Sequence, residues 1–190
     1  NIKKNIPHGS GLGGGSSNAA SIIKFIILHN KLKLSNKKIL KLGNLIGSDV
    51  PISIVGKNSY IDGKTIKIFQ RTKIKFNMLI VFPNIACSTK KIYLKNKKFS
   101  KSKFISNLAL NDKKKLINYL KNERNDLEET VVKIYPQIGK LIEAISTQKG
   151  CYFSRMSGSG SACIGLFSSI NNASLAKKFV KRNFPKYWCE

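Results

Sequence analysis

Near the start of the chain, a glycine-rich loop runs directly into an apolar helical pattern. Five of the 14 glycines fall between positions 9 and 15, and the residues from there to about Asn30 are apolar around most of a helix circumference. Such a loop exposes backbone N–H groups, and the start of a helix adds more of them with a partial positive charge. The pattern predicts an anion site suited to nucleotide phosphates. It also predicts a core-buried helix, capped by Ser16 or Ser17. A flexible linker is the alternative, but linkers are not normally followed at once by a buried helix.

Composition restricts the function classes. The 190 residues suffice for one large domain or two small ones, and the formal net charge of +26 favours anionic partners. The basic residues are scattered along the whole length, without an RNA-binding aromatic signature or zinc-finger spacing, so no nucleic-acid partner is expected. The sequence contains no run of about 18 apolar residues, so no membrane span is expected. The four cysteines form no Cys-x-x-Cys pair and are expected to be free thiols, which indicates a cytoplasmic location.

Local patterns predict the order of the remaining elements. They indicate a helix from Ser35 to Ile46, strands at 52–55, 59–61, 65–69 and 73–82, a solvated lysine-rich loop at 90–103, helices at 112–121, 126–135 and 136–146, strands at 150–155 and 161–167, and a helix at 173–181. This uneven mixture predicts an α+β fold rather than regular βαβ repeats. We expect two domains, residues 1–72 and 73–190.

Two common nucleotide loops are excluded by single residues. Gly9, Gly11 and Gly14 match the spacing G-x-G-x-x-G. A dinucleotide-binding fold adds an acidic residue about twenty positions further on, but residues 30–44 contain neither Asp nor Glu. A Walker A loop ends in Gly-Lys-Ser/Thr, whereas this loop ends in Gly15-Ser16-Ser17.

Four stretches, in the same order along the chain, resemble motifs of the GHMP small-molecule kinases. Residues 7–19 resemble the phosphate loop of that superfamily, residues 47–51 its catalytic segment, residues 125–128 a helix start and residues 156–162 its third motif. The variant Gly-Leu-Gly-Gly-Gly-Ser-Ser-Asn-Ala-Ala at 11–20 is most similar to one branch of the superfamily. That branch phosphorylates the 2-hydroxyl of a cytidine-diphosphate-linked methylerythritol in the non-mevalonate isoprenoid pathway.

The resemblance implies both an architecture and a site. It implies part of a ribosomal S5-like N-terminal domain followed by a ferredoxin-like C-terminal domain, in a monomer or weak homodimer that uses ATP and Mg²⁺. The implied nucleotide-binding residues are Pro7, His8, Gly9, Ser10, Gly11, Leu12, Gly13, Gly14, Gly15, Ser16 and Ser17. The implied substrate loop is Ser157, Gly158, Ser159 and Gly160, for which a tight connection between two strands is the alternative.

Asp49 is the candidate catalytic base. It and Asp62 are the only acidic residues among the first 111, and Asp62 lies in an Asp-Gly turn. The residues alone leave Asp49 open between a helix-end cap and a catalytic role. The resemblance implies the catalytic role. Because His8 and His29 are isolated, no metal site built from protein ligands is expected.

Two other functions stay open, another GHMP kinase or a basic RNA-associated binding protein. The resemblance also places a lysine and cytidine contacts ahead of the glycine loop, whereas this sequence begins a few residues before it. We therefore expect the 190 residues alone to be poorly active.

Overall fold

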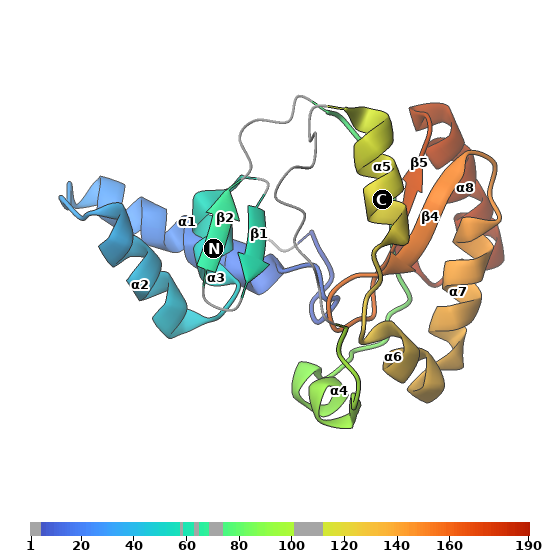
Figure 1. The fold of residues 1–190 in the computed structure, drawn as a ribbon, viewed down its shortest axis with the longest axis horizontal. Helices are drawn as coiled ribbons and strands as arrows, with labels where there is room; N and C mark the ends of the chain where they lie inside the picture. The colour runs from blue at the N-terminus through green and yellow to red at the C-terminus, as the bar shows by residue number, and fades with distance from the viewer. Residues whose placement is uncertain (1–4, 58, 63–64, 69–73, 101–111) are drawn as a thin grey trace. The chain divides into compact units, whose positions relative to one another are not determined.

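The computed structural model describes residues 5–57, 59–62, 65–68, 74–100 and 112–190 (Figure 1). Contacts divide the chain into two compact units. Unit 1 contains residues 1–12 and 74–190, and unit 2 contains residues 13–73. The glycine-rich loop passes from unit 1 into unit 2 between Leu12 and Gly13. These units differ from the expected domains 1–72 and 73–190 in where they assign the first twelve residues. Compact units are not themselves domain boundaries, so the expected domains stay a prediction.

Unit 1 is built on a four-stranded antiparallel sheet in the order β4-β5-β3-β6. The strands are β3 (Asn77–Phe82), β4 (Cys151–Met156), β5 (Cys163–Phe167) and β6 (Trp188–Cys189). Helices α7 (Pro136–Ser146) and α8 (Ile170–Asn183) form the connections before β4 and after β5. This strand and helix order is that of a ferredoxin-like domain. The expected α+β class and the ferredoxin-like C-terminal part are therefore confirmed.

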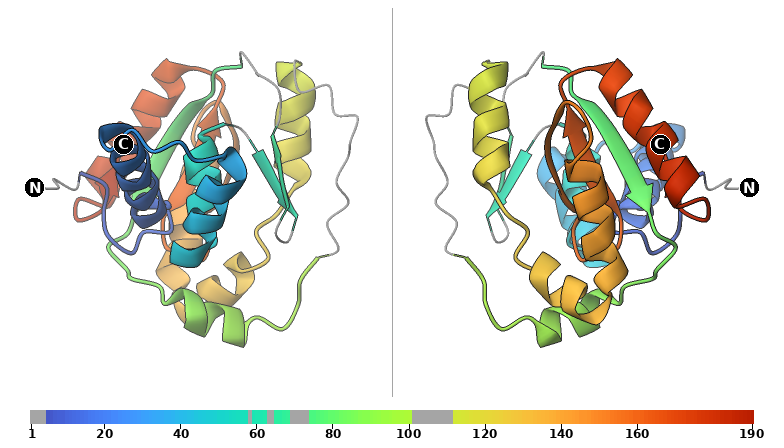
Figure 2. Two further views of the ribbon diagram at one scale, coloured as in Figure 1. Left: turned by 90° about the vertical axis from the view of Figure 1, so that its left-hand side faces the viewer. Right: turned by 90° about the vertical axis from the view of Figure 1, so that its right-hand side faces the viewer.

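The core of unit 1 lies between the sheet and these two helices. α8 runs alongside β3, and α7 covers β4 and β5 (Figure 2). Each helix contributes three buried residues at helical spacing, and alternate residues of β3 and β5 face them. The set is Ile138, Leu141 and Ile145 from α7, Ala173, Ala176 and Val180 from α8, and Leu79, Val81, Cys163 and Phe167 from the strands.

The described residues of unit 1 form three further helices: α4 (Thr89–Lys95), α5 (Lys113–Asn122) and α6 (Glu128–Ile134). α4 contradicts the first part of the solvated loop expected at 90–103, and residues 101–103 of that stretch lie outside the described residues. The Ser88 side chain accepts a hydrogen bond from the backbone N–H of Lys91, and Ile92 is buried in the core. One cap and one apolar anchor therefore suffice to form a short helix in a stretch whose lysines remain in solvent.

All four cysteines lie in unit 1, and all are free, as expected. Burial raises the pKa of the Cys163 thiol far above its ordinary value, so this sulfur is an unreactive core atom. Across the described ranges, no helix combines the length and the apolar character needed to span a bilayer.

Unit 2 contains α1 (Gly14–His29), α2 (Asn36–Ile46), α3 (Val50–Val55) and the hairpin of β1 (Ser59–Asp62) with β2 (Thr65–Ile68). The Ser35 side chain caps α2, as expected. The strand expected at 52–55 is wrong, because these residues belong to α3. Pro51 in the first turn and left-handed Gly56 at the C-cap enclose this short helix. A short apolar run by itself does not distinguish a helix from a strand.

Two expectations for α1 are also corrected. The N-cap is Gly13, not Ser16 or Ser17, and only Ala20 is buried. The side chains of Phe25 and Leu28 are 64% and 77% exposed. α1 is apolar around most of its circumference, but α2 and α3 contact only part of it. The described residues of unit 2 therefore leave an apolar face of α1 in solvent.

Candidate active site

Within unit 1, the first half of the glycine-rich loop is hydrogen-bonded to the loop between β4 and β5. The backbone N–H of Ala162 donates to the carbonyl oxygen of Ser10 at 3.0 Å, and Ser10 is buried. The Ser157 hydroxyl donates to the carbonyl oxygen of Gly11 at 3.2 Å across 146 positions of sequence. The structure therefore brings part of the predicted phosphate loop together with the predicted substrate loop. Beside this contact, Pro7 and Leu12 are half-buried and His8 is exposed.

Gly11 permits this contact between the two loops. Its φ of 75° lies in the left-handed region. A Cβ atom there would lie 2.7 Å from the carbonyl oxygen of Gly160 and 2.8 Å from that of Ser157. Both obstacles are backbone atoms, so no rotamer change relieves the collision. Gly11 is therefore needed for the packing of the two loops, whatever else the loop binds.

The second half of the glycine-rich loop, in unit 2, has a different environment. Gly13 is the N-cap of α1 with a φ of 68°, and no side chain caps the helix. The first helical hydrogen bond runs from the backbone N of Ser17 to the oxygen of Gly13 at 2.9 Å, so the N–H groups of residues 14–16 precede the ladder. A Cβ on Gly13, Gly14 or Gly15 would meet no described atom within 4 Å. The first turn of α1 has no acidic residue. This helix start can therefore accept an anion.

The loop of residues 157–160 is held by three other parts of unit 1. The Asn125 amide nitrogen donates to the carbonyl oxygens of Met156 and Gly158 at 3.0 and 2.7 Å. The Glu128 carboxylate accepts from the backbone N–H of Met156 at 2.7 Å. The hydroxyls of Thr89 and Ser159 lie 2.8 Å apart. The loop does connect β4 to β5, but these contacts specify its shape far more closely than a simple connection requires.

Sequence reasoning missed these supporting residues. Thr89 lies in a lysine-rich stretch that carried no signal. Asn125 and Glu128 belong to a stretch that resembled a family helix start, but nothing local indicated their contacts. One helical turn after Thr89, on the same face of α4, the ring of Tyr93 is 53% exposed and stacks on Phe99 with 6.2 Å between ring centroids.

Asp49 lies in unit 2 at the N-cap position of α3, and its side chain is exposed. Its carboxylate accepts a hydrogen bond from the Ser48 hydroxyl at 3.2 Å. The side chain makes no capping bond to α3. Among the described residues it also forms no salt bridge. A capping role is thus not what holds this carboxylate, and its oxygens remain accessible to a ligand.

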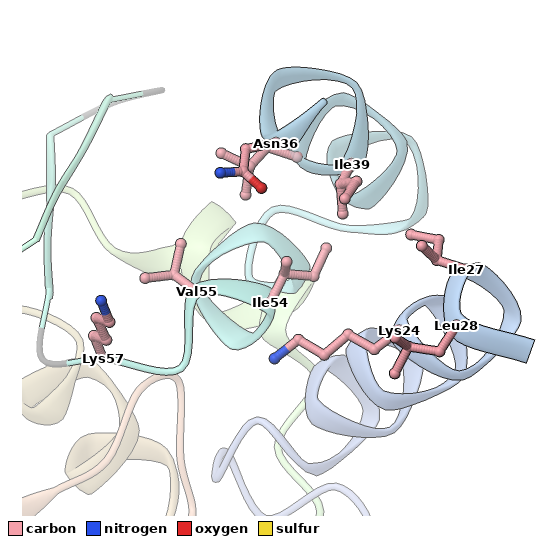
Figure 3. A pocket seen from close by; sticks show the side chains of 9 residues that line it. Lys24, Ile27, Leu28, Asn36, Ile39, Ile54, Val55 and Lys57 are labelled. Carbon is pink, nitrogen blue, oxygen red and sulfur yellow. The ribbon is translucent and has the colours of Figure 1, made fainter. Parts of the chain in front are cut away.

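A cleft of about 510 Å³ lies between the three helices of unit 2 (Figure 3). The Lys24 side chain extends from α1 along its edge toward α3. The lining is mostly aliphatic and comprises Lys24, Ile27, Leu28, Asn36, Ile39, Leu40, Ile54, Val55 and Lys57. None of the predicted site residues lines this cleft, so it is distinct from the glycine loops and from Asp49.

Comparison with known families identifies both halves of the chain. Residues 1–57 match the GHMP kinases N-terminal domain, and residues 104–186 match the GHMP kinases C-terminal domain. The chain belongs to the GHMP kinase family. A relative of this GHMP kinase in Pelagibacter ubique (strain HTCC1062), named 4-diphosphocytidyl-2-C-methyl-D-erythritol kinase, is 39% identical over 99% of this chain. A relative of the same name in Anaplasma phagocytophilum (strain HZ) is 33% identical over 98% of the chain. The chain spans 66% and 63% of the lengths of these two relatives.

Solved structures support the fold of this GHMP kinase. A crystal structure of 4-(cytidine 5'-diphospho)-2C-methyl-D-erythritol kinase matches 98% of the chain, and 68% of its own length, with a TM-score of 0.74 at 24% identity. A homoserine kinase from Cytophaga hutchinsonii matches 98% of the chain and 66% of its own length, with a TM-score of 0.71 at 16% identity. At these identities the likeness is one of fold alone.

Proposed function

We propose that this GHMP kinase takes part in ATP-dependent phosphorylation of the 2-hydroxyl of 4-diphosphocytidyl-2-C-methyl-D-erythritol in the non-mevalonate isoprenoid pathway. The names of the relatives at 39% and 33% identity support the choice of acceptor. The observation that carries the proposal is the uncapped start of α1, where three backbone N–H groups lie beside glycines with open space around them. The free cysteines support a cytoplasmic enzyme.

The start of α1 is suited to the β- and γ-phosphates of ATP. Its N–H groups and partial positive charge offer fixed donors to the phosphate oxygens, and the missing side chains allow close approach. Gly9, Gly11 and Gly13 all have positive φ and alternate with Ser10 and Leu12, a backbone pattern that forms anion-binding concavities. The hydroxyls of Ser16 and Ser17 are available to Mg²⁺, which neutralises charge on the phosphates when bound.

Asp49 is the proposed general base. The acceptor oxygen forms a bond to the γ-phosphorus, while the bond from that phosphorus to the bridging oxygen of ADP breaks with its electron pair. The proton of the acceptor hydroxyl passes to the carboxylate of Asp49. Because that carboxylate is exposed and, among the residues that the structure describes, accepts a hydrogen bond only from the Ser48 hydroxyl, its oxygens can receive the proton.

The loop of residues 157–160 and the exposed ring of Tyr93 are proposed to serve the acceptor. The backbone N–H groups of Gly158 and Ser159 are offered to the diphosphate, because those of Ser157 and Gly160 already donate to carbonyl oxygens. Thr89 ties the loop to the helix that bears Tyr93. An exposed aromatic ring offers a stacking surface for the cytosine base. The diphosphate and the cytosine base of the acceptor thus each have a suitable group in unit 1.

The test measures ADP release by the complete protein encoded by the reading frame that contains these residues, with and without the acceptor. We expect acceptor-dependent turnover that falls about 10²- to 10⁴-fold in Asp49→Asn, the range for loss of a general base. Asp62→Asn is the matched control, because Asp62 is the other acidic residue of the first 111, and it should keep its turnover.

Three results would overturn the proposal. Folded protein that consumes ATP only with another small alcohol, such as homoserine or mevalonate, would favour a different GHMP kinase. RNA binding that weakens steeply with salt and is unchanged in Asp49→Asn, without turnover, would favour the RNA-associated alternative. Full turnover in Asp49→Asn would remove Asp49 as the base.

A further inference from the structure

We infer that Asn125 is a positioning residue for both glycine loops: its amide fixes the loop of residues 157–160, and through that loop it fixes residues 9–12, which it does not touch. The inference rests on the proposed function, because it assigns to Asn125 a coupling between the acceptor side and the nucleotide side of one kinase site. The Asn125 carboxamide forms three hydrogen bonds, one through its oxygen and two through its nitrogen.

The Asn125 side chain has one orientation. Its oxygen accepts from the backbone N–H of Leu127 at 3.0 Å, at the start of α6. Its nitrogen therefore faces the loop and donates to two carbonyl oxygens, those of Met156 and Gly158. The backbone oxygen of Asn125 also accepts from the N–H of Glu128 at 3.0 Å. The residue is half-buried and is anchored on its own side before it reaches the loop.

The two carbonyl groups held by Asn125 flank Ser157. Fixing them restricts the backbone on both sides of that residue, and so restricts the direction of its hydroxyl. That hydroxyl donates to the carbonyl oxygen of Gly11. The backbone oxygen of Ser157 also lies where a Cβ on Gly11 would collide with it. The position of Ser157 therefore determines both a hydrogen bond and a close packing contact of the nucleotide loop.

Ala162 provides a second connection between the two glycine loops. The N–H of Ala162 donates to the carbonyl oxygen of Ser10, and the oxygen of Ala162 accepts from the N–H of Ser157 at 2.8 Å. Residues 10 and 11 are thus both bonded to the segment whose shape Asn125 sets. Loss of the amide contacts should loosen the two loops together.

Only a side chain with two N–H donors and an acceptor fits this position. Asn125→Asp keeps the acceptor for Leu127 but places a second carboxylate oxygen against two carbonyl oxygens. Asn125→Ala removes all three bonds. Glu129→Gln is the matched control, because Glu129 lies on the adjoining helix α6 but its exposed carboxylate pairs with Lys133 at 2.6 Å instead of with the loop.

The first test is amide hydrogen exchange on the complete protein without ligands. We expect exchange at Gly160 and at Ala162, whose N–H donates to the carbonyl oxygen of Ser10, to be about tenfold faster in Asn125→Asp, as for loss of about 1.4 kcal/mol of local stability. Residues 10 and 11 contribute carbonyl oxygens to the contact, so residues 9–12 are followed by NMR relaxation on the same samples, and their backbone order parameters should fall. The amides of β3 and β5 should be unchanged, and so should every segment in Glu129→Gln. Faster exchange at Gly160 with unchanged order parameters in residues 9–12 would overturn the inference, because Asn125 would then support its own loop only.

The second test is kinetic. In Asn125→Asp the KM for ATP should rise about tenfold together with the KM for the acceptor. A rise for the acceptor alone would overturn the coupling. If Asn125→Asp does not fold, Ser157→Ala provides the same test by removing only the hydroxyl bond to Gly11, and it should lower the order parameters of residues 9–12. The first test needs no substrate, so it would still decide the role of Asn125 if the proposed acceptor were wrong.

Discussion

Gly11 and Gly14 lie three residues apart in one loop, yet the structure excludes a side chain at only one of them. At Gly11 the φ is 75° and two backbone carbonyls occupy the space of a Cβ. At Gly14 the φ is not positive, and no described atom lies within 4 Å of that space. A glycine-rich loop thus combines two physical requirements. Gly11 is glycine because the protein packs against it, and Gly14 has no such reason within the described residues.

Among the variants considered, the largest effect on folding is expected at Gly11. Gly11→Ala should lower the free energy of unfolding by about 2–3 kcal/mol, since left-handed strain and a backbone collision add. Urea unfolding at neutral pH measures it. Gly9→Ala is the matched control, because Gly9 has a similar φ of 69° but its nearest atom is the Ala86 Cβ at 3.8 Å. It should lose only about 1–2 kcal/mol. Equal losses in the two variants would mean that the contact with residues 157–160 contributes nothing.

Gly14→Ala should have the opposite effect on folding. Alanine at the first helical position reduces the freedom of the unfolded chain, so stability should rise by about 0.4–1 kcal/mol. The added methyl group occupies the space proposed for phosphate, so the affinity for ATP should fall about tenfold, or about 1.4 kcal/mol. Titration calorimetry with ATP and urea unfolding measure the two quantities. A variant with higher stability and unchanged ATP affinity would refute the phosphate role of the open glycines.

The sequence predicts helices and strands well where the pattern of apolar residues is local and strongly periodic. The buried faces of α7 and α8, strands β3 to β5 and the Ser35 cap follow from spacing and capping rules that need no knowledge of distant residues. α3 and α4 were missed because short segments acquire helical structure from a single cap, a proline or one buried residue such as Ile92. The expected burial of α1 failed because periodicity shows which faces are apolar, not which of them find a partner.

The candidate site divides in the same way. The glycine loops and Asp49 were visible as motifs, and the resemblance to GHMP kinases assigned their roles. The contacts that shape the second loop were not visible, because they join residues 28 to 70 positions apart, as for Glu128 with Met156 and Thr89 with Ser159. A single sequence carries no local signature of such pairs. The structure is therefore needed to separate a glycine that packs from a glycine that binds.

The smallest effect is expected at Asp126, which lies outside both glycine loops. Its carboxylate accepts from the backbone N–H and hydroxyl of Ser100 at 2.7 and 2.8 Å and pairs with Arg124 at 3.0 Å. The hydrogen bond from the Ser100 N–H is the main cause that lowers the pKa of Asp126, followed by the Ser100 hydroxyl and Arg124. Because the folded pKa lies below the unfolded value of about 3.9, the ionised carboxylate stabilises the fold above that pH. This contribution is lost as the pH falls through the folded pKa.

Asp126→Asn should therefore reduce the stability at pH 7 by less than about 1 kcal/mol, and the gap to the native protein should narrow toward pH 3. Urea unfolding at both pH values measures the gap, and a gap independent of pH would rule out the charge as its origin. The order parameters of residues 9–12 and hydrogen exchange at Ala162 should not change in this variant, although Asp126 is the immediate neighbour of Asn125. Two adjacent side chains would then differ as Gly11 and Gly14 do: one anchors a separate segment, and the other determines the shape of both loops.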